Sequence, residues 1–245
     1  MKLCRQLSGA LALLALVSSA CSSSPGRPAA DAIPIDPDDL TDFGTLYAQN
    51  CAGCHGPNGK DGASIALANP LYLAIADDAT LRRVTTNGVA GTLMPAFAKS
   101  AGGMLTDQQV DVIVRGIREH WSKAEVLRGE NAPPYAAPNP GDASRGSQVF
   151  AVYCSSCHGL RGSGGAKASS IVDTSYLALV SDQGLRTTVI VGIPELGAPD
   201  WRSNVPGKQM SSQDVSDVVA WLASQRTAFP GQPYHHSDKS AGELQ

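Results

Sequence analysis

The chain resembles itself at an offset of 103 to 105 residues, and this internal repeat limits what it can fold into. A Cys-x-x-Cys-His motif occurs once in each half, followed in both by a glycine-rich stretch. The matched residues are Cys51 with Cys154, Cys54 with Cys157, and His55 with His158. Self-similarity at a fixed offset indicates a duplicated structural unit. The 245 residues therefore predict two similar domains of about 90 residues each rather than one large core.

The segments around the two copies differ from them in composition and define the domain boundaries. We expect a signal peptide over residues 1–20 and a tether rich in Ser, Pro, Ala and Asp over 21–39. The first domain is then 40–129 and the second is 143–229. The intervening segment, 130–142, carries four prolines and predicts a stiff linker. Residues 230–245 form a polar tail.

The periodicity of apolar residues predicts an all-α fold in both domains. Helices are expected over about 42–52 and 143–155, and over 78–86 and 182–191. A last helix begins at an N-cap, Thr106 in the first copy and Ser211 or Ser212 in the second, and carries apolar side chains at helical spacing. No convincing run alternates as a strand would.

The spacing of the Cys-x-x-Cys-His motif suits covalent attachment of a haem. Two cysteines three residues apart at the end of a helix can each reach one vinyl group of the same porphyrin, and the histidine then lies beneath the iron. A zinc site would need further ligands nearby, but the two motifs are 103 residues apart. A thioredoxin-like redox pair would need a βαβ context, which the pattern lacks. The sequence therefore predicts two covalently bound c-type haems.

The overall composition is compatible with that cofactor and argues against nucleic acid. Aromatic residues are only 5% of the chain, so two porphyrins would supply large apolar surfaces that the side chains lack. The formal net charge is −3 and no basic cluster is present. Phosphate binding needs concentrated Lys and Arg, so we expect no nucleic-acid partner.

The N-terminus has the features of a bacterial export signal. Lys2 and Arg5 precede an apolar run over 7–17, which is too short to span a membrane, and small residues follow it. Cys21 comes next and resembles the acylated cysteine of bacterial lipoproteins, although Ser18 stands where Leu is usual. The alternative is ordinary cleavage beside an incidental cysteine. We expect a lipid anchor on Cys21 that holds the protein at the periplasmic side of a cell-envelope membrane.

Beyond the motifs, the sequence resembles the class I cytochrome c family, specifically its dihaem periplasmic members with two fused domains. The resemblance covers about 40–225. It rests on residues 46–56, on Gly-Thr-Leu-Met-Pro-Ala-Phe at 91–97, and on 105–107, 150–159 and 220–222. It implies electron transfer by haem iron with His and usually Met as axial ligands. It also implies redox partner proteins, including a membrane respiratory complex, and a carrier rather than an enzyme.

The distal ligand of the first haem is expected to be Met94. Met94 follows His55 by 39 residues and lies in a loop ahead of the last helix, which matches the distal ligand position of the family. Met104 competes with it but lies next to Leu105 at the helix start, where an apolar staple residue is expected. We therefore expect Met104 to lie in the core.

The second copy departs from this pattern, because Ala198 aligns with Met94. Met210 is the methionine that remains, although it aligns with Leu105, a core position. Three alternatives stay open: Met210 binds the iron, another residue does, or the distal side has no protein ligand. The other residues considered are His120, Lys208, His235 and His236. Met210 is the preferred assignment, and an open iron would allow the alternative function of a haem enzyme acting on peroxide or a small oxyanion.

Three residues outside the motifs also carry expectations. Arg82 and Arg186 occupy equivalent positions and are expected either to pair with haem propionates or to be solvated. Tyr135 lies among the linker prolines and is expected to pack between the domains.

Overall fold

A computed structural model describes residues 35–203 and 205–227 of the chain. The chain divides into two units, Met1–Asp39 and Leu40–Gln245. In the first, the described residues form one 3-10 turn, η2 (Pro37–Asp39). The expected signal peptide, Cys21, His235 and His236 lie outside the described residues. None of the helices in the described part of the chain is long and apolar enough to cross a membrane.

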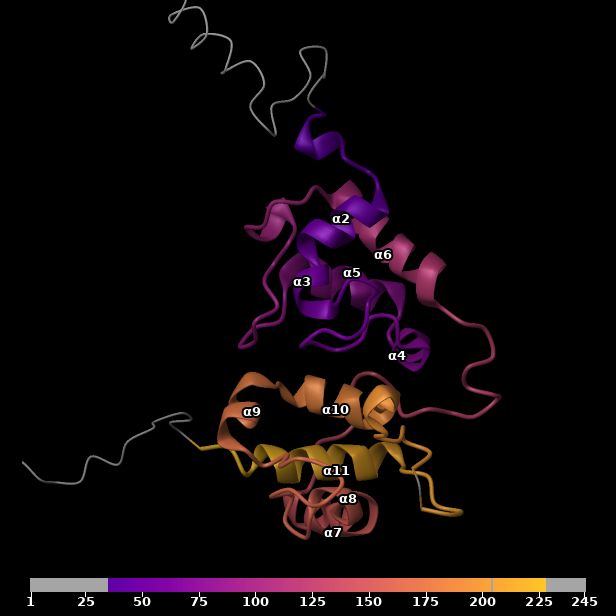
Figure 1. Cartoon of the computed structure of the whole chain (residues 1–245), viewed down its shortest axis with the longest axis vertical. Coiled ribbons are helices and arrows are strands. Elements are labelled where there is room, and N and C mark those ends of the chain that lie inside the picture. The colour runs from indigo at the N-terminus through magenta and orange to yellow at the C-terminus, as the bar shows by residue number, and fades with distance from the viewer. Residues whose placement is uncertain (1–34, 204, 228–245) are drawn as a thin grey trace, which may run out of the picture. The chain divides into compact units, whose positions relative to one another are not determined.

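The second unit contains two successive sets of helices in the same order (Figure 1). The first set is α2 (Phe43–Asn50), α3 (Ala52–His55), α4 (Pro70–Ile75), α5 (Asp78–Asn87) and α6 (Asp107–Trp121), with the 3-10 turn η3 (Lys99–Ala101) before α6. The second set is α7 (Ala143–Tyr153), α8 (Ser155–His158), α9 (Thr174–Leu179), α10 (Asp182–Val191) and α11 (Ser212–Ala223), with η4 (Pro194–Leu196) before α11. We call them the first lobe (40–129) and the second lobe (143–227). Among the described residues, β pairing is limited to two isolated bridges, so the all-α prediction is confirmed.

Side-chain caps explain where the longer helices begin. The side chain of Thr106 accepts from the backbone of Gln109, and the Gln109 side chain accepts in return, which forms a capping box at the start of α6. Ser211 and Asp214 form the equivalent box in α11. Ser211, rather than Ser212, is therefore the N-cap of α11.

The expected first helix of each lobe ends earlier than predicted and is followed by a separate short helix. Cys51 ends α2 and Cys154 ends α7, and the rest of each Cys-x-x-Cys-His motif forms α3 or α8. The sequence interpretation also missed α4 and α9. Six residues make fewer than two turns, which is too short for the apolar periodicity of a helix to be recognised.

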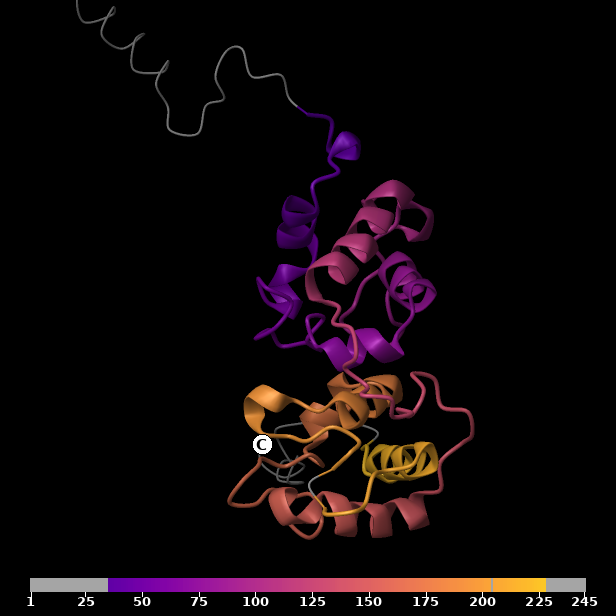
Figure 2. The same cartoon turned by 90° about the vertical axis from the view of Figure 1, so that its right-hand side faces the viewer.

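The first and last helices of each lobe pack closely because one of them carries a glycine at the contact. In the first lobe this is Gly116 on α6, where a Cβ atom would lie 2.1 Å from the ring of Phe43 on α2. In the second lobe it is Gly146 on α7, where a Cβ atom would lie 2.0 Å from the carbonyl oxygen of Asp217 on α11. Figure 2 shows α7 and α11 side by side.

The linker contacts both lobes. Tyr135 meets Tyr72 of α4 edge to face, with ring centroids 6.5 Å apart. The guanidinium of Arg186 on α10 donates to the carbonyl oxygens of Pro134 and Tyr135. The expectation that Tyr135 packs between the domains is therefore confirmed.

Arg82 and Arg186 differ, although the repeat aligns them. Arg186 is only 2% exposed, and besides the linker it donates to the hydroxyls of Ser212 and Ser216. Of the two alternatives for Arg186, the solvated one is therefore wrong, because its guanidinium is buried and bonds both the linker and α11. Arg82 stays partly exposed and pairs with Asp111 on α6.

Candidate haem sites

The first Cys-x-x-Cys-His motif lies at the junction of α2 and α3. The backbone N–H groups of Cys54 and His55 donate to the carbonyl oxygen of Cys51, at 3.2 and 3.0 Å. One tight turn therefore carries all three side chains. Cys51 is buried and Cys54 is exposed, and both are free thiols.

The second motif repeats this arrangement at the junction of α7 and α8. Cys157 and His158 donate through their backbone N–H groups to the carbonyl oxygen of Cys154, at 3.1 and 3.0 Å. Cys154 and Cys157 are free thiols as well. Both lobes therefore present two unpaired thiols and an imidazole on a single turn.

The first thiol of each motif is kept protonated by its surroundings. Burial, with a smaller contribution from the neighbouring Cys54, raises the pKa of Cys51 to about 12. Burial and Cys157 raise the pKa of Cys154 to about 11. Redox-active cysteines instead have lowered pKa values that favour the thiolate. The raised pKa values of Cys51 and Cys154 therefore disfavour the redox-pair alternative.

Each motif histidine is oriented by a backbone carbonyl of the following loop. The Nδ1–H of His55 donates to the carbonyl oxygen of Ile65 at 2.8 Å, and that of His158 donates to Ser169 at 2.9 Å. Since a carbonyl only accepts, Nδ1 carries the proton and Nε2 keeps its lone pair for a metal. Burial also lowers the pKa of His55, which favours the neutral, ligating form.

A glycine directly after each histidine lets the loop turn back to make this contact. Gly56 has a φ of 80°, and a Cβ atom there would lie 1.7 Å from the carbonyl oxygen of Lys60. Gly159 has a φ of 77°, and its Cβ would lie 2.4 Å from the carbonyl oxygen of Gly164. L side chains rarely adopt such a φ, so these two positions require glycine.

The residues present fit a covalently attached haem better than a bare metal ion. Within residues 35–203 and 205–227, no group of three His, Cys, Asp or Glu side chains could hold a metal ion. A structural zinc site requires four such ligands. Two thiols for the vinyl groups and one oriented Nε2 for the iron are what attachment of a c-type haem requires.

The candidate distal ligand of the first lobe, Met94, lies half-buried in the loop between α5 and η3. Its carbonyl oxygen accepts from the N–H of Val89 at 3.0 Å, and its own N–H donates to the Thr92 hydroxyl. Met104 is 79% exposed, so the expectation that it lies in the core is wrong. Leu105 takes that place, because the staple residue is the one directly before the N-cap.

In the second lobe, Ala198 occupies the position of Met94 and Met210 that of Leu105. The carbonyl oxygen of Ala198 accepts from the N–H of Ile193 at 3.1 Å, as that of Met94 does from Val89. Met210 and Leu105 are each 5% exposed and belong to the core. Coordination of the second iron by Met210 stays a prediction, and its placement favours the core alternative.

The other described candidates lie on the surface. His120 is exposed, stacks on Phe43 of the first lobe with ring centroids 4.7 Å apart, and has its Nδ1 2.8 Å from the carbonyl oxygen of Gly116. Lys208 is exposed. The two contacts of His120 are with Phe43 and Gly116 of the first lobe and not with the second motif.

A pair of arginines that the sequence interpretation missed fixes the short helix of each lobe. Arg118 donates to the carbonyl oxygens of Leu73 and Ala76 at the end of α4 and pairs with Asp78. Arg226 does the same for α9. Its partners are the carbonyl oxygens of Leu177 and Val180 and the carboxylate of Asp182. The acceptors match at an offset of 104 but the arginines do not, which is why the repeat alone did not reveal the pair.

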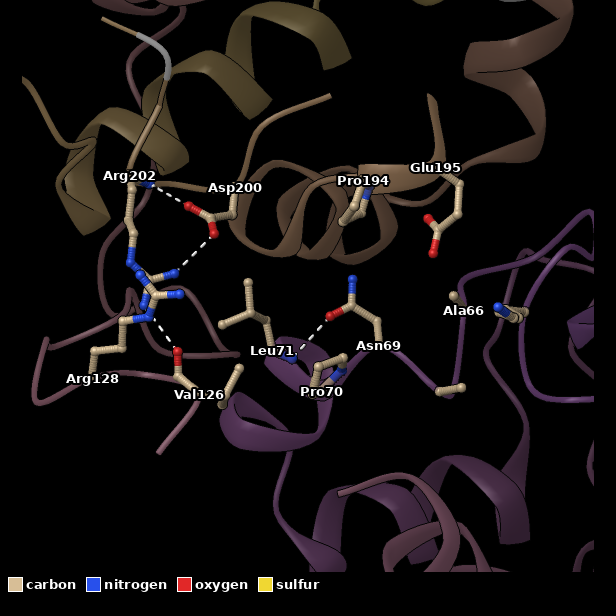
Figure 3. A pocket seen from close by; sticks show the side chains of 12 residues that line it. Ala66, Asn69, Pro70, Leu71, Val126, Arg128, Pro194, Glu195, Asp200 and Arg202 are labelled. Atoms are coloured by element: carbon tan, nitrogen blue, oxygen red, sulfur yellow. Dashed lines mark hydrogen bonds and ion pairs between the residues drawn. The ribbon is translucent and has the colours of Figure 1, made fainter. Parts of the chain in front are cut away.

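A groove of about 360 Å³ lies where α4 of the first lobe meets η4 of the second (Figure 3). Its lining includes Asn69, Glu195, Asp200 and Arg202, and it contains none of the motif cysteines or histidines. Arg202 pairs with Asp200 at 2.9 Å and lies 4.0 Å from the ring centroid of Trp201. The groove is therefore separate from both candidate haem sites.

Comparison with known proteins agrees with this chemistry. The family described as "Cytochrome C oxidase, cbb3-type, subunit III" matches residues 38–115 and 141–222, one segment for each copy of the repeat. The "Cytochrome bc1 complex cytochrome c subunit" of Mycobacterium tuberculosis is 24% identical over 178 residues, which are 72% of this chain and 60% of the relative. The chain thus spans about 60% of that relative's length.

Two further relatives carry related names. The "Cytochrome bc1 complex cytochrome c subunit" of Corynebacterium efficiens is 24% identical over 247 residues, covering 94% of this chain and 79% of the relative. The "Cbb3-type cytochrome c oxidase subunit FixP" of Sinorhizobium medicae is 28% identical over 146 residues, covering 54% of this chain and 44% of the relative.

Proposed function

Because this chain belongs to the family of cytochrome c oxidase, cbb3-type, subunit III, we propose that it is a dihaem c-type cytochrome with one haem in each lobe. The observation that carries the proposal is the repeated geometry of the motif. In both lobes two free thiols share one turn with a histidine whose Nδ1–H donates to a loop carbonyl. This arrangement leaves Nε2 of His55 and of His158 available to an iron.

The chain's own residues would hold, orient and tune the group. Cys51 and Cys54 in the first lobe, and Cys154 and Cys157 in the second, would form thioether bonds by adding their thiols to the vinyl groups of the haem. The loop carbonyls of Ile65 and Ser169 fix the ring plane of each histidine and increase its electron donation through the Nδ1–H bond. When bound, haem supplies reversible one-electron chemistry at its iron.

The proposed activity is the transfer of single electrons between redox proteins of a membrane respiratory chain. The relatives named above are cytochrome c subunits of a bc1 complex and of a cbb3-type oxidase. Their names support a carrier over the haem-enzyme alternative. They also support a membrane respiratory complex as the partner.

We further propose that the protein is anchored by lipid on Cys21 at the periplasmic side of a bacterial membrane. The support is the basic, apolar and small-residue succession of residues 1–20 directly before Cys21. Expression in a bacterium followed by fractionation tests this. The wild type is expected in the membrane fraction and Cys21→Ala in the soluble periplasmic fraction, whereas Cys4→Ala, within the signal, serves as the matched control and stays with the membrane. A soluble wild type would overturn the anchor.

The haem count tests the central proposal. Alkaline pyridine spectra and the intact mass are expected to give two haems per chain that resist extraction with acidified acetone. Removing both cysteines of one motif, Cys51 and Cys54 or Cys154 and Cys157, should leave one haem in either variant. A spectroelectrochemical titration should then resolve two one-electron steps in the wild type. Extractable haem, or a single haem in the wild type, would contradict the proposal.

A further inference from the structure

The backbone of the loop that carries the candidate distal ligand is the same in both lobes. A Cβ atom on Gly88 would lie 2.6 Å from the carbonyl oxygen of Met94, and one on Gly192 would lie 2.7 Å from that of Ala198. Both glycines have a φ of 68°. Ala198 therefore stands at the place of Met94 in space as well as in sequence, with a methyl group instead of a thioether.

Met210 lies at the position of Leu105 and makes the equivalent backbone hydrogen bond. The N–H of Met210 donates to the carbonyl oxygen of Trp201 at 2.8 Å, and the N–H of Leu105 donates to that of Phe97 at 2.8 Å. Leu105 has no ligating atom, so this position serves packing in the first lobe. The equal burial of Met210 indicates the same task in the second.

Trp201 and Arg202, which lie between Ala198 and Met210 in the chain, make contacts that oppose a rearrangement bringing Met210 to the iron. Trp201 is buried and donates through its N–H to the carbonyl oxygen of Ile190 at 3.0 Å. Arg202 donates to the carbonyl oxygen of Val126 beyond α6 (Figure 3). It also donates to the carbonyl oxygen of Leu127 and pairs with Glu130. Moving this segment would break all of these contacts.

We infer that the haem held by His158 has no protein ligand on its distal side and binds a small neutral diatomic molecule there, because Ala198 replaces the thioether and Met210 is fixed in the core. This inference rests on the proposed function. Ala198 offers only a methyl group on that side, which neither ligates an iron nor donates a hydrogen bond, so a small neutral molecule suits this position better than an anion.

Carbon monoxide added to the reduced holoprotein tests the inference, with optical spectra as the readout. Fast binding of one carbon monoxide per two haems is expected. Ala198→Met should abolish this fast binding, because the new thioether stands where Met94 does. Met210→Leu, which copies Leu105, should leave the spectra and the binding unchanged.

Three results would overturn the inference. One is a wild type that does not bind carbon monoxide although it contains two haems. Another is carbon monoxide binding that appears only when His235 and His236 are both replaced by alanine, because the tail would then supply the ligand. The third is a Met210→Leu variant whose second haem changes spectrum. The pyridine haem count separates these from failure of the proposed function, because that failure would show as fewer than two covalent haems.

Discussion

Arg186 binds the linker through Pro134, whose carbonyl oxygen lies 3.1 Å from Nε and 2.9 Å from Nη2 of the guanidinium. Burial lowers the pKa of Arg186, so the hydrogen bonds offset the cost of keeping a charge inside. Its remaining donors reach Ser212 and Ser216 on α11. One side chain thus joins the linker, α10 and α11.

We expect Arg186→Met to lower the free energy of unfolding by about 3 kcal/mol. The substitution leaves linker carbonyls and two hydroxyls without their donor, and an unsatisfied buried group costs roughly 1–3 kcal/mol. Urea denaturation of the holoprotein, followed by far-UV circular dichroism, measures the change. Arg82→Met is the matched control from the first copy. Its exposed ion pair with Asp111 contributes at most about 1 kcal/mol, so equal losses in both variants would contradict this role of Arg186.

The sequence predicts those features of the repeat for which local chemistry demands particular residues. It does not predict contacts whose partners come from distant segments of the chain. Thioether attachment needs two cysteines and a histidine within five residues, so the motifs were recognisable at once. The bounds of α10 also followed from local pattern, and the predicted 182–191 is what the structure has. The carbonyl partners of His55 and His158 belong to the backbone and leave no residue signature.

Equivalent positions in a duplicated chain need not have equivalent partners in the fold. This explains why the expectations for Arg186 and Met104 failed. Arg82 and Arg186 align, yet only Arg186 has a linker to bind. Met104 was expected in the core because it stands near the helix start, but only the residue directly before the N-cap turns inward. Such differences depend on tertiary contacts that no pattern within one copy encodes.

Gly146→Ala is expected to destabilise the second lobe by more than about 2 kcal/mol. A Cβ atom would meet the backbone of Asp217 at 2.0 Å, and overpacking against backbone typically costs 1–3 kcal/mol. Gly44→Ala is the control in the corresponding helix of the first lobe, where the nearest atom is 3.4 Å away. That variant should be more stable than the wild type by about 0.5–1 kcal/mol. Thermal unfolding of both variants measures this difference in stability. An unchanged stability of Gly146→Ala would show that α7 and α11 can move apart freely.

Replacing Tyr47 with Phe should change the alkaline stability of the protein. The Tyr47 hydroxyl donates to the buried carbonyl oxygen of Gly56 at 2.9 Å, whereas Phe150 fills the equivalent position in the second lobe without a hydroxyl. Loss of this bond should cost about 1 kcal/mol at neutral pH.

The pH dependence of that variant has a definite sign. Burial, aided by Cys51, raises the pKa of Tyr47 from 10.0 to about 12. Above pH 10 the unfolded chain releases the phenol proton while the folded chain retains it, so the wild type loses stability between pH 10 and 12. Tyr47→Phe lacks this loss, and the stability difference between the two proteins should shrink across that range in urea titrations. A difference that stays constant from pH 9 to 12 would refute the role of Tyr47.

Met94→Ala should abolish the near-infrared absorption band that a methionine sulfur gives with ferric haem iron. The thioether of Met94 is the distal ligand expected for the first lobe, on a loop fixed by the contacts of its backbone with Val89 and Thr92. The variant should also bind a second carbon monoxide per chain in the reduced state, because both irons would then be open. Met104→Ala serves as the control, since that side chain is 79% exposed, and it should keep the band. If the band survives Met94→Ala but is lost in Met104→Ala, the distal ligand of the first haem is Met104, and the loop of Met94 has only a structural role.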